Sequence, residues 1–459
     1  MSTAAGTFGS APAPMSWGAH ARATLALGVP LVGSQLGTML MNTTDTVMLG
    51  WYGVTDLAAG VIATQVIHTV ILFGAGIAYA VVPMAASAEG QGDVSQVRRS
   101  VRMGLWASVL FCLIMMPILW FIEPILLALG QNADVAALAR EYMRIAQFSL
   151  FAVLAWWTLR SFLTAIERTR IVFVATIAGI FLNAAVNWAF IFGNWGAPEL
   201  GVRGAALATL ATQSLVLAVV AAYAARADRA RPYAIFVRLW RPDWQALGEV
   251  VRIGLPIGTM IVAEAGLFVA ASILMGWIGV TALAAHGIAM QLASLAFMVP
   301  LGMAQAATAR VGQFHGRGDR FGLDRAAKTV MALCLGFAAM SAALFFAVPD
   351  FLIGLFLDEA DPGAPAVLAY AVPLLFVAAC FQLADSAQAI GAALLRGLKD
   401  TRVPMIIALI AYWPVGMVLA WLLGFVAGLG GIGVWIGLAS GLTAAAILLN
   451  WRFFILRPL

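Results

Sequence analysis

Two stretches of this chain, 226 residues apart, carry the same pattern. Residues 50–59 read GWYGVTDLAA, and residues 276–285 read GWIGVTALAA. The same shift pairs Gly28 and Pro30 with Gly254 and Pro256, and it pairs the turn GQGD at 90–93 with GRGD at 316–319. The chain therefore contains two copies of one unit, and its fold must place the same set of elements twice.

Each copy consists mostly of apolar runs long enough to cross a lipid bilayer, which takes about 20 residues of helix. The composition agrees, because 63% of the residues are hydrophobic and only 10% are charged, whereas a soluble domain carries about 25% charged residues. Helices satisfy their own backbone groups in lipid, and no run alternates as a membrane barrel strand would. We predict an all-α membrane protein with twelve transmembrane helices, at 24–49, 57–83, 103–122, 141–164, 170–192, 203–225, 252–276, 283–308, 328–348, 366–394, 403–425 and 433–455.

The domain organisation follows from the repeat. Six helices per copy is an even number, so both copies enter the membrane from the same side and the repeat is parallel. We expect a disordered tail over 1–23, a first six-helix lobe over 24–225, a linker over 226–250 and a second lobe over 251–459. The linker holds Trp240 and Trp244 among several arginines, a composition that predicts an amphipathic helix at the membrane surface.

Loop charges predict the orientation. Basic residues gather in the loops on one side of the twelve predicted helices, and the opposite loops are mostly acidic. Cytoplasmic loops of membrane proteins carry the excess of Lys and Arg, so both termini are expected in the cytoplasm. The basic residues on that side are Arg22, Arg98, Arg99, Arg102, Arg168, Arg170, those from 226 to 252 and from 310 to 328, Arg396, Lys399, Arg402, Arg452 and Arg457.

Three carboxylates lie well inside apolar runs: Asp45, Glu264 and Asp385. An ionisable side chain near the bilayer centre costs about 2.5–3.5 kcal/mol on insertion scales, so it is usually retained for a function. Carboxylate oxygens can bind Na⁺, and a desolvated carboxyl can instead take up a proton. The alternative is a neutral acid that forms a hydrogen bond to a neighbouring helix.

Amide side chains accompany these acids. Asn183 and Asn187 are four residues apart, so they share one face of a helix. Gln382 and Gln388 flank Asp385, and Gln291 lies on the helix that follows Glu264. These five amides are candidates for substrate binding or for support of the acids, and hydrogen bonding between helices is the alternative.

Other chemistries lack a signature in the sequence. There is no phosphate-binding loop, no nucleophile elbow and no His/Cys/Asp cluster with metal spacing. The net charge of +5 is explained by arginines at helix ends rather than by a nucleic-acid site. We therefore expect neither an enzyme nor a bound cofactor.

The residues resemble one family. DTVMLG at 45–50, GLP at 254–256 with Glu264, and Asp385 followed by LLRGLKDT at 394–401 are together similar to the multidrug and toxic compound extrusion (MATE) transporters, in their bacterial NorM-like branch. The resemblance covers the chain from about Gly28 to the end of the twelfth predicted helix.

The resemblance implies a V-shaped pair of six-helix lobes in the bacterial inner membrane, working as a monomer. It implies export of cationic or amphipathic drugs in exchange for Na⁺ or H⁺ by alternating access. The cation site of the NorM-like branch carries over to Glu264 and Asp385, and the first-lobe site of the family carries over to Asp45 and Asn183. Two positions depart from the family pattern: Phe381 replaces a common tyrosine, and Asn187 replaces an aspartate of some members.

Two other functions stay open from the sequence. A lipid-linked precursor flippase of the same superfamily would need several basic residues in its cavity, and Arg160 is the one deep basic candidate. A membrane enzyme or non-transporting scaffold would show no ion-dependent flux.

Overall fold

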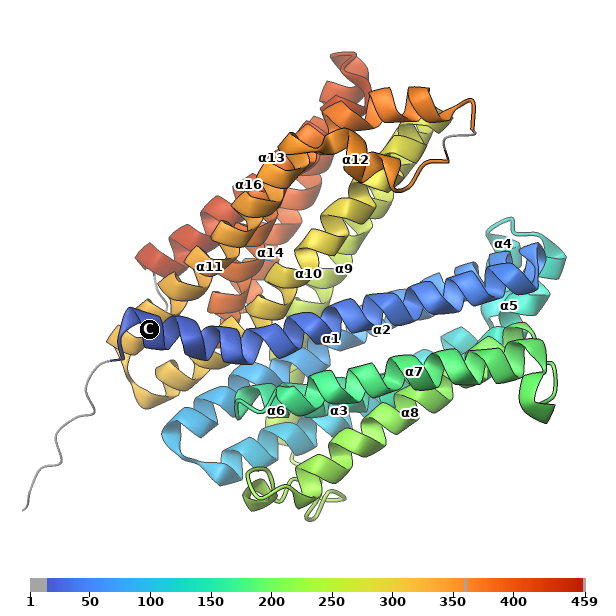
Figure 1. Cartoon of the computed structure of the whole chain (residues 1–459). Coiled ribbons are helices and arrows are strands. Elements are labelled where there is room, and N and C mark those ends of the chain that lie inside the picture. Colours follow the sequence, from blue (N-terminus) through green and yellow to red (C-terminus); the bar gives the residue numbers. More distant parts are fainter. Residues whose placement is uncertain (1–14, 359–360, 457–459) are drawn as a thin grey trace, which may run out of the picture.

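The computed structural model describes residues 15–358 and 361–456, and the regular elements within these ranges are all helices. Figure 1 shows that the long helices run the length of the molecule, while short ones connect their ends. In chain order the α-helices are α1 (Trp17–Tyr52), α2 (Val54–Gln91), α3 (Val94–Trp120), α4 (Ile122–Ala128), α5 (Ala133–Ala146), α6 (Ser149–Ala165), α7 (Arg170–Phe192), α8 (Val202–Arg226), α9 (Trp244–Ile278), α10 (Val280–Arg317), α11 (Arg320–Ala347), α12 (Pro349–Gly354), α13 (Ala364–Gly397), α14 (Arg402–Ile410), α15 (Val418–Trp421) and α16 (Gly430–Trp451).

The predicted membrane spans are present in the structure. Eleven helices in the described ranges are long and apolar enough to cross a bilayer, and the pair α5 and α6, bent by 49°, supplies a twelfth. The sequence pattern predicted one continuous helix over 141–164 here. At the bend the Ser149 hydroxyl donates to the carbonyl oxygen of Ala146 at 2.7 Å, and side chains that enter the backbone hydrogen-bond ladder are a known cause of kinks.

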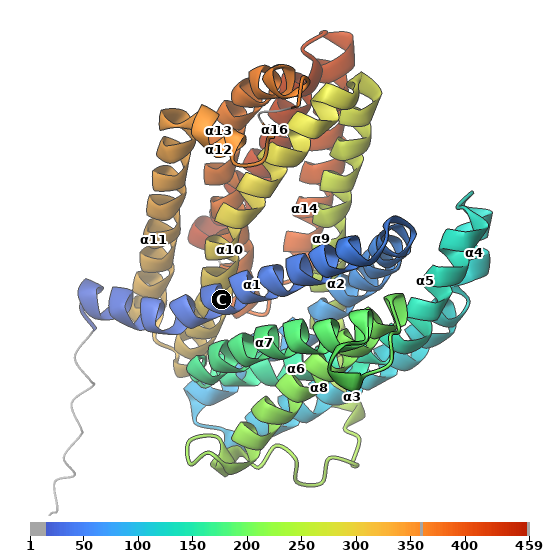
Figure 2. The same ribbon diagram turned by 45° about the vertical axis from the view of Figure 1, so that its right-hand side comes forward.

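The helices form two bundles. Helices α1–α8 and α9–α16 meet at one end of the molecule and diverge toward the end that carries α4 and α12 (Figures 1 and 2). We call the end where α1 and α9 begin the closed end, and the opposite end the open end. The first helix begins at Trp17, whereas the sequence pattern placed its start near residue 24; residues 1–14 of the expected tail lie outside the described residues.

The closed end is held by contacts that repeat the symmetry of the sequence. Gly90 of α2 lies against the backbone of Gln313 in α10, and Gly316 of α10 lies against the backbone of Ser87 in α2. The shift of 226 residues converts one contact into the other. A Cβ atom at either glycine would overlap the facing carbonyl oxygen, so glycine permits the two helices to approach this closely.

Each bundle also receives the start of the other bundle's first helix. Ala246 and Val250 of α9 are buried in the core of the first bundle, while Met260 and Leu267 of the same helix are buried in the core of the second. In the reverse direction, Arg310 of α10 donates to the backbone carbonyl of His20 and to the Thr24 hydroxyl in α1, both at 2.7 Å. The closed end is therefore a shared interface.

The linker between the bundles runs from 227 to 243 and follows the surface of α3. It contains one short 3-10 turn, Arg231–Tyr233, so the amphipathic helix predicted for this stretch is wrong. Its backbone carbonyls accept hydrogen bonds from α3 instead: Arg98 donates to Tyr233 and Trp106 donates to Leu239. Donors on α3 thus take the place of the hydrogen bonds that a helix would form within itself.

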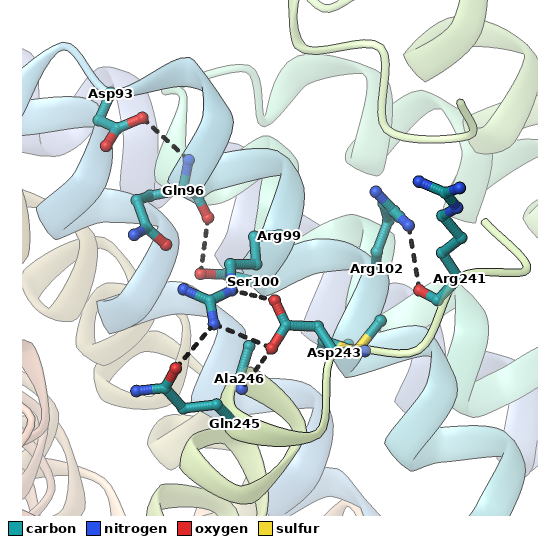
Figure 3. Close-up of polar contacts among 10 residues, drawn as sticks. Asp93, Gln96, Arg99, Ser100, Arg102, Arg241, Asp243, Gln245 and Ala246 are labelled. Carbon is teal, nitrogen blue, oxygen red and sulfur yellow. Dashed lines mark hydrogen bonds and ion pairs between the residues drawn. The ribbon is translucent and has the colours of Figure 1, made fainter. Parts of the chain in front are cut away.

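The last residues of the linker form an ion pair with α3. The guanidinium of Arg99 donates to both carboxylate oxygens of Asp243, and that carboxylate also accepts from the backbone N–H of Ala246 (Figure 3). Asp243 therefore caps the start of α9 while it holds the linker on the first bundle.

Candidate ion-coupling and binding sites

In the second bundle, the buried polar residues converge from three helical segments. Glu264 lies on α9, and Gln388 lies on α13. The amide nitrogen of Gln388 donates to Glu264 Oε1 at 3.2 Å and to the hydroxyl of Tyr412 at 2.6 Å. Tyr412 belongs to a π-helical segment, Ala411–Met417, that follows α14. One amide thus connects a carboxylate to a phenol inside the membrane-spanning region.

Asp385 completes this cluster one turn before Gln388. Its side chain is 4% exposed, and it interacts electrostatically with Glu264 and Tyr412. Its Oδ1 atom is buried without a hydrogen-bond partner among the described residues. A buried polar atom left unpaired costs about 1–3 kcal/mol, and more if it is charged. The pair of acids is therefore incomplete unless a proton or a cation joins it.

The other two glutamines lie in different surroundings. Gln382, one turn before Asp385, is buried, and its amide nitrogen has no partner among the described residues. It lines a narrow crevice with Asp385, Pro300 and Phe337. Gln291 has an exposed side chain with no recorded hydrogen bond to Glu264, so the structure does not bring it into the cluster.

Tyr412 is the residue that sequence reasoning missed. The sequence has Phe381 where a phenol is common in the resembling family, and the structure shows that Phe381 is buried against Phe268 and Trp435. Tyr412 supplies a phenol from a different helical segment. The available signal was a lone tyrosine inside an apolar run two residues before Pro414, because a proline removes one backbone donor and π-helical turns often mark functional sites.

In the first bundle, a single carboxylate is held by the two predicted asparagines. The amide groups of Asn183 and Asn187 on α7 donate to Asp45 Oδ1 on α1 at 3.0 and 2.6 Å. The amide of Asn187 also donates to Asn183 Oδ1 at 3.3 Å. The spacing of four residues on α7 therefore directs both amides at one oxygen.

Asp45 borders a cavity of about 120 Å³ within the first bundle. The hydroxyl of Tyr142 lies at this cavity, accepts a hydrogen bond from Thr64 at 3.3 Å and interacts electrostatically with Asp45. The wall combines polar and aromatic side chains: Thr38, Asn42, Asp45, Thr64, His68, Tyr142, Trp156, Trp157, Thr209 and Gln213.

The two clusters suit different chemistry. It is unfavourable for two neighbouring carboxylates in a low-dielectric interior to carry a negative charge at the same time, so this arrangement is chemically suited to a monovalent cation or a proton. Asp45 is already held by two neutral donors beside a cavity. Among the described residues no group of three or more His, Cys, Asp or Glu side chains is placed to hold a metal ion.

Twelve apolar spans, two bundles joined at one end and acids enclosed within each bundle define a multi-pass membrane transporter. A family model named MatE matches residues 30–189 and 256–422, two segments that begin at equivalent positions of the repeat. The chain belongs to this family.

Individual relatives agree with the family match. The chain is 52% identical over 439 residues to a probable multidrug resistance protein NorM of Rhizobium meliloti, which covers 96% of this chain and 94% of the relative. It is 48% identical to the corresponding protein of Agrobacterium fabrum, over 96% of this chain and 95% of the relative. These matches place it in the NorM-like branch of the MATE transporters and confirm the expectation of a transporter rather than an enzyme.

The fold is that of the family as well. The crystal structure of the eukaryotic MATE transporter AtDTX14 superimposes with a TM-score of 0.83, covering 96% of each chain at 20% sequence identity. The predicted twelve-helix MATE-like architecture is therefore confirmed.

Proposed function

We propose that this chain is a secondary active multidrug exporter of the bacterial inner membrane. It exchanges cationic or amphipathic compounds for Na⁺ or H⁺ and works as a monomer. The printed names of its relatives support multidrug resistance as the biological role. The observation that carries the proposal is the acid pair of the second bundle, in which Asp385 keeps an unpartnered buried oxygen beside Glu264.

The mechanism is alternating access by rocking of the two bundles, which act as the first and second lobes of the repeat. The closed end corresponds to the cytoplasmic side, because the loops at this end carry the excess of basic residues. In the described conformation the lobes diverge at the opposite end, which corresponds to an outward-open state. Both chain termini then lie in the cytoplasm.

Coupling requires that each ligand prefer a different conformation. A cation or proton at Glu264 and Asp385 favours the outward-open state, and the drug favours the reverse. Neutralising the pair removes the repulsion between its carboxylates, which lowers the free energy of the state in which Glu264 on α9 and Asp385 on α13 lie together.

Transport measured in proteoliposomes with separate gradients tests this proposal. Purified protein is reconstituted, a fluorescent lipophilic cation is supplied, and Na⁺ and pH gradients are imposed one at a time. We expect uptake or release driven by one of the two gradients, with the rate in protein-free vesicles as the background. Flux that ignores both gradients would contradict ion-coupled export.

A further inference from the structure

Arg160 on α6 is a buried cation that the transport mechanism leaves unused. Its side chain is 2% exposed, and one guanidinium nitrogen donates to Gln35 Oε1 on α1 at 3.0 Å. Its Nε and Nη2 atoms are buried without a hydrogen-bond partner among the described residues. A charged donor in this position is costly, so an arginine with two free N–H directions indicates a missing acceptor.

A second arginine approaches the same place from the other bundle. Tyr79 of α2 lies within electrostatic range of Arg160 and also of Arg396 on α13, and Arg396 is in addition within electrostatic range of Glu264. Among the described residues the Arg396 guanidinium has no recorded hydrogen bond or ion pair. The Tyr79 ring is stacked on Trp157, with centroids 5.7 Å apart and planes inclined by 7°. Two cations from opposite bundles therefore act electrostatically on one phenol, whose ring lies on a flat aromatic support.

The place of this cluster in the fold connects it to substrate entry. Tyr79 follows Gly76 on α2 by three residues, and Gly76 is packed against the backbone of Gly258 in α9. The cluster thus lies where the bundles meet, on the side toward the closed end. Because Arg160 is almost fully covered in the outward-open state, an occupant reaches it only when the closed end parts.

We propose that Arg160, Arg396 and Tyr79 form a site for the oxyanion of an amphipathic substrate, a proposal that rests on the proposed exporter function. Guanidinium groups bind carboxylate and phosphate through paired N–H donors, and a phenol adds a third donor. The oxyanion is the carboxylate of a drug-like zwitterion or the phosphate of a lipid headgroup. An arginine that only locked the bundles together would have its donors satisfied across the interface, and Arg160 does not.

A matched pair of dyes tests the site. Tetramethylrhodamine methyl ester is a cation, and tetramethylrhodamine differs from it by a free carboxylate. Binding to the purified protein is measured by fluorescence polarisation, and flux is measured in proteoliposomes. In Arg160→Gln and in Arg396→Gln we expect the free acid to bind at least about tenfold more weakly, the loss expected for one charged hydrogen bond, while the ester changes less than about twofold. Arg160→Lys restores part of the affinity.

The control is Arg229→Gln, which removes one positive charge from an exposed position in the linker and should leave both dyes unchanged. If Arg160→Gln does not fold, the ratio of free-acid affinity to ester affinity is measured in Arg160→Lys and Arg396→Gln instead. The site predicts that this ratio is lower in both variants than in the native protein. In the variants that fold, an equal loss of affinity for both dyes would contradict a carboxylate site, and so would an unchanged affinity for both. A phosphate headgroup is then the remaining occupant, and a separate experiment tests it.

Short-chain lipids distinguish that source. Dihexanoyl phosphatidic acid and dihexanoyl phosphatidylcholine are added as competitors of the ester. The site is assigned to a lipid phosphate if phosphatidic acid displaces the ester from the native protein but not from Arg160→Gln, while binding of the free-acid dye is the same in both proteins. If no anion depends on Arg160, the proposal is wrong. Polarisation needs no ion gradient, so a failure of ion-coupled transport would leave this test intact.

Discussion

The two bundles share one architecture but enclose different acids. In the first bundle Asp45 stands alone and accepts from two asparagines. In the second, Glu264 and Asp385 lie together with Gln388 and Tyr412, and an oxygen of Asp385 stays unpartnered. All three acids are at least partly buried, so the difference in chemistry comes from how many charges share the site and how many donors surround them.

The acids also occupy different positions of the repeated unit. A shift of 226 residues carries Glu264 onto Thr38 and carries Asp45 onto Ala271. Within one unit the two acids therefore lie seven residues apart, which is about 10 Å along a helix. The repeat preserved the helices and the glycine contacts of the closed end, while the polar residues diverged. Under the function proposed above, the two bundles would divide two tasks, with ion coupling in the second and ligand contact in the first.

The largest expected effect is in the second bundle. Asp385→Asn and Glu264→Gln each keep the shape of the side chain and remove its charge, so neither variant can exchange a cation or a proton. We expect gradient-driven export to fall at least about 100-fold, as for loss of an essential charge worth about 3 kcal/mol. Flux in proteoliposomes is the measurement, and amounts of folded protein are checked by size-exclusion chromatography. Normal transport by both variants would eliminate the second bundle as the coupling site.

A smaller effect is expected in the first bundle. Asp45→Asn keeps the size of the side chain but removes its charge, so the hydrogen bonds that Oδ1 accepts from the amides of Asn183 and Asn187 become neutral ones. We expect export to fall about tenfold with ion coupling retained, because a hydrogen bond to a charged group contributes about 1.5–3 kcal/mol and a neutral one about 0.5–1.5 kcal/mol. The ratio of rates with and without the gradient should remain that of the native protein. A loss of this ratio would mean that both bundles couple ions.

Tyr412→Phe sharpens the role of the phenol. It removes the acceptor of the Gln388 amide and leaves a fully buried ring in place. One hydrogen bond is worth about 1 kcal/mol, so we expect the apparent affinity for the coupling ion to weaken about fivefold while maximal flux changes little. Flux is titrated against Na⁺ and against pH in separate series. Tyr370→Phe, at the open end, is the matched control, since its hydroxyl contacts the backbone of Gly431 instead. If Tyr412→Phe has the same ion affinity as the native protein, the hydroxyl takes no part in ion binding and the ring contributes only to packing.

The smallest effect concerns the joint between the bundles rather than either site. The Arg99 guanidinium lowers the pKa of Asp243 in the folded protein, and about a third of each side chain is exposed. The ion pair therefore stabilises the fold above the ordinary pKa of aspartate, about 3.9, and this contribution is lost as the pH falls through the lowered value.

We expect Asp243→Asn to lower the unfolding temperature by a degree or two near pH 7, since half-exposed ion pairs contribute about 0–1 kcal/mol. The difference from the native protein should shrink as the pH falls below about 3.9 and disappear once the pH is below the lowered pKa of Asp243. Asp228→Asn in the same linker is the control and should have no effect at either pH. A difference that persists at the lower pH would assign the loss to the capping of α9 rather than to the charge pair.

The membrane environment, the number of spans and the repeat could all be predicted from the sequence. An apolar run of about 20 residues indicates a helix surrounded by lipid. The repeat is visible when the sequence is aligned with itself, so no knowledge of tertiary contacts is needed. It also pointed to Asp45, Glu264 and Asp385, because an acid in an apolar run is conspicuous wherever the chain folds. The spacing of Asn183 and Asn187 placed both amides on one face of a single helix, which is local information.

Which residues meet across helices depends on how the helices pack, and the sequence pattern does not show this. Tyr412, 148 residues after Glu264, joins the acids through Gln388, while Gln291, on the very next helix, does not. The linker forms no amphipathic helix, since α3 offers donors that its composition could not reveal. Likewise Arg160 and Arg396, on different bundles, are both within electrostatic range of Tyr79. Distances between side chains on separate helices depend on how each helix is rotated about its axis and on the angle at which the helices cross. A helix surrounded by lipid is apolar on all faces, so its sequence does not show which face points toward the neighbouring helix.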